Sequence, residues 1–168
     1  MFPEILNKGI WHTTSVDGYK GILTTGSIHP EPSIPDTERW SSADNPHFVR
    51  SLGGVSLFEF LAFDAESYTE RYPQSMWRNF VPCCQKWKEA IWIEIDCKAI
   101  QENFLDGATL LGLWREGVNQ GTARKIMPLI EAAHIGSIPV SAFLRVLKYS
   151  KHNEEFTELS THRKSDAL

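Results

Sequence analysis

The chain has 168 residues with a formal net charge of −4, and 42% of the residues are hydrophobic, including six tryptophans. This size and composition fit one globular domain, and the negative charge argues against non-specific nucleic-acid binding through a large positive field. No apolar run approaches the roughly 20 residues that cross a bilayer, no secretory signal is visible, and the three cysteines form no even disulfide framework, so we expect a reduced, cytoplasmic protein with no membrane partner.

The first predicted elements are a short strand over residues 9–13 and a helix that follows Ser15. A serine here is a good N-cap, because its hydroxyl accepts a hydrogen bond from a free backbone amide of the first turn. Apolar side chains then recur at helical spacing, and Gly26 is well placed to end the helix in a left-handed conformation.

Residues 27–53 predict a long segment without regular structure. Four prolines interrupt it, and Ser, Asp, Asn and Gly fill the gaps between them. Loops of this length are usually functional or mobile, and this one carries His29, Arg39, His47 and Arg50.

The rest of the chain alternates between strand and helix patterns. Isoleucines at 91, 93 and 95 make residues 89–96 the clearest strand. The other predicted elements are a strand over 55–63, helical pieces within 64–88, a short helix or turn over 98–105, an ambiguous stretch over 107–127, a strand over 129–133 and a turn with the last strand over 138–150. This order favours an α+β domain over residues 1–151, followed by a mobile polar tail over 152–168.

Several common site motifs are missing from the sequence. It contains no GxGxxG, no GxxxxGK[ST], no HExxH and no GxSxG. Cys83 and Cys84 are adjacent and lack the ligand spacing of a structural metal site, so we expect no metal. A Cys–His nucleophile is possible on paper, but nothing local supports it.

Two acidic residues of the clearest strand have two interpretations. Glu94 and Asp96 share one face and could act as general acid and base. The same alternation is ordinary in a half-buried sheet whose other face meets solvent, and we favour that structural interpretation.

His12 also has two interpretations. A lone histidine at a strand end is more often structural. However, His12 lies where a strand meets a helix N-terminus, beside the hydroxyls of Thr13 and Thr14. An imidazole, hydroxyls and free helix amides together suit a ligand that carries phosphate or ribose.

Three segments, in this order, resemble the ADP-ribosyltransferase superfamily. They are WHTTSVDGYKGILTTGSI (11–28), RSLGGVSLFEF (50–60) and MPLIEAAHIGSIPVSAFLRVL (127–147), and the arrangement is similar to the DNA-modifying branch. The second segment lacks the tyrosine of the diphtheria-toxin-like branch and the Ser-Thr-Ser of the arginine-modifying branch. The late glutamate has Leu129, not Glu or Gln, two residues before it, so the class of acceptor does not carry over.

The resemblance implies a split mixed or antiparallel sheet with flanking helices, and transfer of ADP-ribose from NAD to a protein or nucleic acid. A bacterial toxin, defence or phage setting would fit such an enzyme. Candidate residues follow from the motifs. Glu131 and Arg50 would be catalytic. His12 would bind a ribose, Thr13 or Thr14 would place the nucleotide, and Arg39 or Arg50 would bind the pyrophosphate. Ser56 would contact NAD, and Phe58, Phe60 or Trp40 would stack on the nicotinamide.

Other interpretations stay open at this point. Glu131 could instead pair with Arg124 or Lys125, and Glu94 is the second candidate for the key carboxylate. The same fold could hydrolyse NAD or remove an RNA 2′-phosphate with NAD, although basic residues for that phosphate are sparse. A binding module with a degenerate, non-catalytic cleft is the alternative outside the enzymes.

Overall fold

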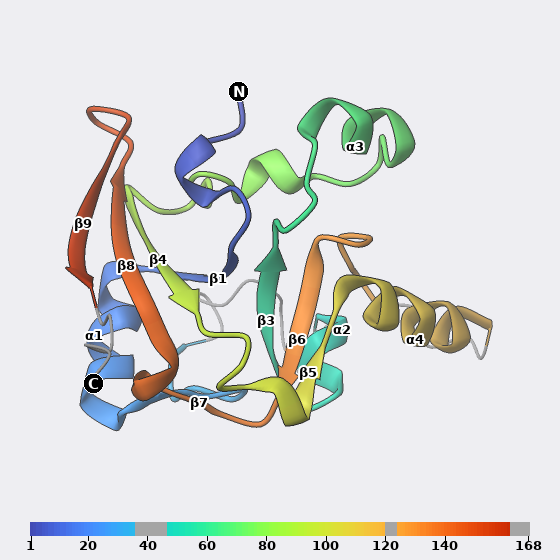
Figure 1. Ribbon diagram of the computed structural model, residues 1–168, viewed down its shortest axis with the longest axis horizontal. Helices are drawn as coiled ribbons and strands as arrows, with labels where there is room; N and C mark the ends of the chain where they lie inside the picture. Colours follow the sequence, from blue (N-terminus) through green and yellow to red (C-terminus); the bar gives the residue numbers. More distant parts are fainter. Residues whose placement is uncertain (36–46, 120–123, 162–168) are drawn as a thin grey trace, which may run out of the picture.

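Strands form the centre of the molecule in this computed structural model, which describes residues 1–35, 47–119 and 124–161 (Figure 1). The strands are β1 (Ile10–Thr14), β2 (Ser27–Ile28), β3 (Gly54–Glu59), β4 (Glu89–Ile95), β5 (Phe104–Leu105), β6 (Glu131–Ile135), β7 (Ile138–Pro139), β8 (Phe143–Ser150) and β9 (Glu155–Thr161). The α-helices are α1 (Val16–Thr25), α2 (Phe48–Ser51), α3 (Ala65–Arg71) and α4 (Gly107–Asn119). Short 3-10 helices are η1 (Glu4–Leu6), η3 (Trp77–Asn79), η4 (Gln101–Asn103) and η5 (Val140–Ala142).

Seven strands form one sheet in the order β5-β6-β3-β1-β4-β8-β9, and each pair of neighbours runs antiparallel. β2 and β7 pair separately, also antiparallel. Helices are few and flank this sheet rather than alternating with parallel strands (Figure 1). The architecture is therefore α+β with an antiparallel sheet.

The sheet opens between β1 and β3. Ile10 and Trp11 pair with Glu59 and Phe58 of β3, and the pairing stops there. From Trp11 to Thr14, β1 pairs with β4 on its other side. The two strands diverge beyond Trp11, and we call this opening the β1–β3 split.

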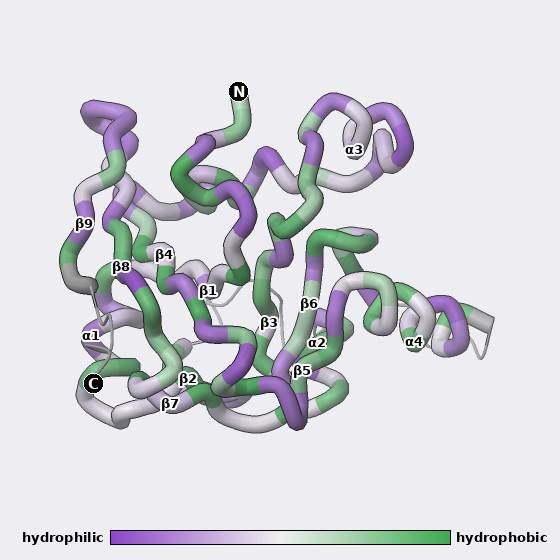
Figure 2. The backbone as a smooth tube through the Cα atoms, in the orientation of Figure 1, coloured by the Kyte–Doolittle hydropathy of each residue, from purple (hydrophilic) through white to green (hydrophobic). Residues whose placement is uncertain are grey.

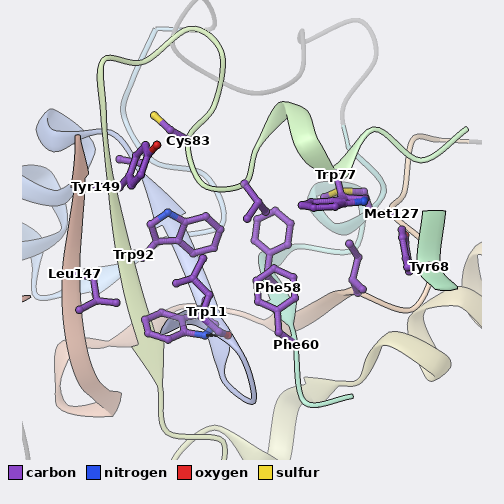
Figure 3. Close-up of a cluster of buried hydrophobic side chains, with 14 residues drawn as sticks. Trp11, Phe58, Phe60, Tyr68, Trp77, Cys83, Trp92, Met127, Leu147 and Tyr149 are labelled. Carbon is purple, nitrogen blue, oxygen red and sulfur yellow. Dashed lines mark hydrogen bonds between the residues drawn. The ribbon is translucent and has the colours of Figure 1, made fainter. Parts of the chain in front are cut away.

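An apolar layer covers each face of the sheet, because side chains alternate along its strands. On one face, Phe58 and Phe60 stack with ring centroids 5.3 Å apart, beside Trp11 and Trp92 (Figure 3). The isoleucines of β4 pack on the other face, as the sequence predicted. Fully burying one such large side chain contributes about 1.5–3 kcal/mol. Figure 2 shows hydrophobic residues along the central strands and mostly hydrophilic ones on α3 and the β8–β9 turn.

Helix α1 begins and ends where the sequence predicted. Ser15 Oγ accepts a hydrogen bond of 3.0 Å from the Gly18 amide. Gly26 has φ +76° and donates its amide to Ile22 O, which satisfies one of the last carbonyls of the helix. The cap fixes the orientation of α1 directly after β1.

The regions with weak periodicity differ from their predictions. The strand predicted over 55–63 ends at Glu59, and the segment 64–88 holds only α3 and the single turn η3. Pro73 and Pro82 lack an amide hydrogen and limit helix length in that segment. The ambiguous stretch after residue 107 forms helix α4.

The prediction of a mobile tail from residue 152 is wrong for the residues of β9. They pair antiparallel with β8 and extend the sheet by one strand, so β8 is not the last strand. Phe156 packs on Tyr149 with ring centroids 4.9 Å apart. An edge strand that offers one apolar side chain to the core has almost no hydrophobic pattern, which explains the error. Residues 162–168 of the predicted tail lie outside the described residues.

Candidate functional site

A cavity of about 350 Å³ lies at the β1–β3 split. Both strands, the first turns of α1, residues 28–34 and part of the segment 80–87 contribute to its walls. Six polar or aromatic residues matter most for its chemistry: His12, Thr13, His47, Arg50, Ser56 and Phe58. The volume is within the range of about 300–1,000 Å³ that is usual for small-molecule sites.

His12 bridges the split. Its Nδ1 lies 3.1 Å from the carbonyl oxygen of Ser56, on the strand that no longer pairs with β1 at this level. A carbonyl can only accept, so the proton is on Nδ1 and Nε2 is left as an acceptor. Burial lowers the pKa of His12, despite the opposing effect of the Ser56 hydrogen bond, and so favours the neutral ring. The structure thus places His12 in the cavity, as the ligand-binding interpretation requires.

Both neighbouring threonines also line this cavity. Thr13 Oγ1 is buried and has no hydrogen-bond partner among the described residues. Thr14 Oγ1 lies where α1 approaches the strand, and a Cβ on Gly18 would be 2.2 Å from it. Gly18 therefore lets the first turn of α1 lie directly against β1.

Glu131 is fully buried, with 0% of its surface exposed. Ser56 Oγ donates a hydrogen bond of 2.8 Å to Oε1, and the Met127 amide donates one of 3.0 Å to Oε2. His47 Nδ1 lies 2.8 Å from Oε1, within ion-pairing distance when the ring is protonated. Both carboxylate oxygens are engaged, so the orientation of the group is fixed.

A tight turn sets Glu131 at the start of β6. Its amide donates to Met127 O at 3.0 Å, and Leu129 within the turn has φ +63°. A left-handed conformation at a leucine costs on the order of 1 kcal/mol or more and persists only where the surroundings impose it. The backbone of Leu129 packs against Gly107, at the start of α4, where a Cβ would lie 1.8 Å from the leucine oxygen.

Glu131 stands behind the cavity wall rather than in it. Ser56 and His47 line the cavity and both contact the carboxylate, which is not itself among the lining residues. The structure shows these contacts in place of the alternative pairing with Arg124 or Lys125. One layer of side chains separates the charge from the cavity.

Arg50 lines the cavity and is held by Glu31. Its Nε and Nη2 donate to the two carboxylate oxygens of Glu31, the second at 2.9 Å, which makes a bidentate pair. Glu31 is exposed, with 56% of its side-chain surface accessible. Arg39 and Trp40, the other candidates from this segment, lie outside the described residues.

The two described aromatic candidates, Phe58 and Phe60, differ in their position relative to the cavity. Phe58 contributes to the cavity wall, whereas Phe60 is fully buried in the aromatic cluster and is not among the lining residues (Figure 3). A stacking role for Phe60 therefore has no support from its position.

The alternative carboxylate lies elsewhere. Glu94 accepts a hydrogen bond of 3.0 Å from Arg145 Nε on β8, and neither it nor Asp96 lines the cavity. His134, near Glu131 in sequence, has its Nδ1 at 3.2 Å from Gly136 O. The ion pair supports a structural role for Glu94, but the prediction that its strand face meets solvent is wrong, because Trp92 on that face is fully buried.

Cys83 offers little nucleophilic character. Burial raises the pKa of Cys83 to about 11, so its thiol stays protonated near neutral pH. Cys84 contributes to the cavity wall, and it is buried. Within residues 1–35, 47–119 and 124–161, no group of three or more His, Cys, Asp or Glu side chains could hold a metal ion.

Sequence reasoning missed the contact between His47 and Glu131. The histidine lies in the proline-rich segment, where no periodicity predicts the direction of a side chain. Its position three residues before Arg50 was the available signal. The Met127 amide and the aromatic wall formed by Phe80 and Trp87 had no signal at all.

No protein-family model matches this chain, and the search of curated proteins also gave no match. In the part of the chain that the structure describes, no helix has the length and apolar character needed to span a membrane.

Proposed function

We propose that the protein is an NAD-dependent ADP-ribosyltransferase that transfers ADP-ribose to a protein or nucleic acid. One observation carries the proposal. The three segments that resemble the superfamily, far apart in the sequence, meet at one cavity: the first and second line it, and the third supplies Glu131, which is bonded to Ser56 of the second.

The residues of the cavity fit the chemical groups of NAD. The neutral His12 ring offers an acceptor and Thr13 a hydroxyl, and both suit ribose hydroxyls. Arg50 holds a carboxylate with both arms of its guanidinium, the geometry that also binds phosphate oxygens. Phe58 adds an apolar wall for a planar ring.

The carboxylate of Glu131 supplies the charge that the reaction needs. Positive charge develops on the ribose as its bond to nicotinamide breaks, and a fixed negative group in a site of low dielectric stabilises it. Across one layer of side chains, roughly 4–8 Å, a unit charge contributes on the order of 2–4 kcal/mol at an effective dielectric constant of about 20. The two hydrogen bonds to Glu131 pre-organise it and avoid reorganisation during the reaction.

The cavity favours transfer over removal of an RNA 2′-phosphate. Arg50 is the one arginine or lysine among its described lining residues, and a phosphate-removing enzyme needs several. This enzyme stays the second candidate, together with simple NAD hydrolysis.

Incubation with NAD that carries a label on its adenylate phosphate, together with a cell extract, tests the proposal. Label on protein or nucleic acid supports transfer. Free nicotinamide with labelled ADP-ribose only would indicate hydrolysis. If neither product forms and calorimetry detects no heat of NAD binding, the enzyme proposal is wrong and a non-catalytic binding module is the remaining interpretation.

A further inference from the structure

His47 and Glu131 form a carboxylate–imidazole pair at the cavity wall. His47 is the N-cap residue of α2, and Glu131 begins β6. Nδ1 and Oε1 are 2.8 Å apart, and 11% of the histidine side chain and none of the glutamate side chain is exposed. The pair therefore has a buried member and a member that reaches the cavity.

The carboxylate sets the tautomer of the neutral ring. Nδ1 faces an ionised oxygen at 2.8 Å, a contact that is repulsive unless this nitrogen carries a proton, so a neutral His47 carries its proton on Nδ1, although the N–H is not aligned for a hydrogen bond to Oε1. Nε2 is then the lone-pair nitrogen of a residue that lines the cavity. A buried carboxylate behind a histidine that can take a proton is the arrangement that general bases share on unrelated folds.

We propose that His47 is the general base that takes the proton of the acceptor, with Glu131 orienting its ring. This inference rests on the proposed function. The acceptor lone pair forms a bond to the anomeric carbon of the nicotinamide-side ribose, while the carbon–nitrogen bond to nicotinamide breaks. The electron pair of that bond neutralises the pyridinium nitrogen. The proton of the acceptor moves to His47 Nε2, and the resulting imidazolium is stabilised by Glu131 until the proton passes to solvent.

Replacement of His47 tests this role against a structural one. We expect His47→Gln to slow the labelling of cell-extract macromolecules from NAD by about 10²–10⁴-fold, the usual contribution of a general base. The dissociation constant for NAD, measured by calorimetry, should change less than about threefold, since the base acts on the acceptor. His152→Gln is the matched control, because His152 is exposed at the β8–β9 turn and should leave the rate unchanged.

Chemical rescue provides the readout that a purely structural role would not give. Free imidazole should restore the rate of His47→Gly at least tenfold, because it can occupy the vacated space and accept the proton. The ring tautomer of His47 in the wild-type protein, read from ¹⁵N shifts, provides a test that needs no folded His47 variant. It should show Nδ1 protonated and Nε2 unprotonated in the neutral form.

The outcomes separate this inference from the proposed function. If the wild-type protein labels the extract and His47→Gln is equally active, the general-base role of His47 is wrong and the proposed function stands. The general-base role is also wrong if His47→Gln loses NAD binding, if imidazole gives no rescue, or if the neutral ring is protonated on Nε2. A wild-type protein that neither binds nor consumes NAD overturns the proposed function and the role of His47 with it.

Discussion

Ser56 and Glu131, which are 75 residues apart in the chain, are joined by a hydrogen bond of 2.8 Å from the hydroxyl to Oε1. The register of β3 and β6 produces this contact, because Phe58 lies opposite Glu131 and Ser56 lies two residues away on the same face. A serine inside a strand pattern thus becomes the link between the cavity and a buried carboxylate.

Ser56→Ala should impair both the fold and the activity. It removes one donor from a buried carboxylate, a loss of about 1.5–3 kcal/mol of unfolding free energy for a hydrogen bond to a charged group. NAD turnover should fall about 10- to 100-fold, because Glu131 loses part of its orientation. Urea unfolding and nicotinamide release measure the two effects. Ser51→Ala, at the exposed last residue of α2, is the control, because its hydroxyl bonds only the Phe48 carbonyl within that helix. Equal behaviour of the two variants would contradict the link.

Glu31→Gln should strengthen NAD binding. Glu31 occupies the guanidinium of Arg50 that a pyrophosphate would need, and an exposed ion pair is worth at most about 1 kcal/mol. Loss of this ion pair corresponds to a gain in NAD affinity of up to about fivefold. Calorimetry measures the gain, and thermal unfolding should stay nearly unchanged. Glu158→Gln on β9 makes the same charge change far along the sheet. An equal gain in that control would show a long-range charge effect and not competition at Arg50.

Because His12 is buried as a neutral ring, we expect the protein to lose stability on acidification. Its pKa in the folded protein is lowered from the ordinary value of 6.5, chiefly by burial. Above pH 6.5, His12 is neutral in both the folded and the unfolded protein, so it does not change the free energy of unfolding. As the pH falls below 6.5, the unfolded chain takes up a proton that the folded protein does not, so the free energy of unfolding falls by up to about 1.4 kcal/mol per pH unit.

Urea unfolding at pH 7.5 and 5.5 measures this dependence. The difference between the two pH values should be smaller in His12→Gln than in the wild type, since the other titrating groups are common to both proteins. An unchanged difference would mean that His12 is not buried in its neutral form.

Gly107→Ala should destabilise the protein by about 3 kcal/mol, at the upper end of overpacking effects. A Cβ there would lie 1.8 Å from the backbone oxygen of Leu129, in the turn that orients Glu131. Gly112→Ala in the same helix α4 meets nothing within 4 Å and should stabilise by about 0.5–1 kcal/mol. Chemical denaturation compares the two. A tolerated alanine at 107 would show that the turn is not fixed by this contact.

The sequence allowed prediction of those elements that local chemistry specifies. The cap at Ser15, the stop at Gly26 and the isoleucine face of β4 depend on neighbouring residues and are confirmed. Strand β9 was missed because an edge strand needs few apolar side chains. The extent of α3 was overestimated, because apolar residues of the segment 64–88 face the core from turns.

The site was predictable only in part for the same reason. His12, Ser56 and Glu131 lie in or beside strands, where position in a motif fixes position in space. The contact of His47 with Glu131, and that of Glu31 with Arg50, depend on the path of an irregular segment across the cavity. No local pattern specifies such a path, so these contacts came from the structure.

Glu131→Gln removes the buried negative charge behind the cavity wall. Glutamine keeps the shape, its carbonyl can still accept from the Met127 amide, and its amino group can donate to Ser56 Oγ. His47 accommodates this amino group by carrying its proton on Nε2 instead of Nδ1. The variant should therefore fold and bind NAD, while it lacks the negative charge.

The decisive measurement is the rate of nicotinamide release from NAD by the wild type and by Glu131→Gln, with NAD affinity determined for both. We expect turnover by the wild type, affinities within about threefold of each other, and a loss of about 10²–10³-fold in the rate of the variant. Equal rates in the two proteins, or no release and no binding by the wild type, would contradict it.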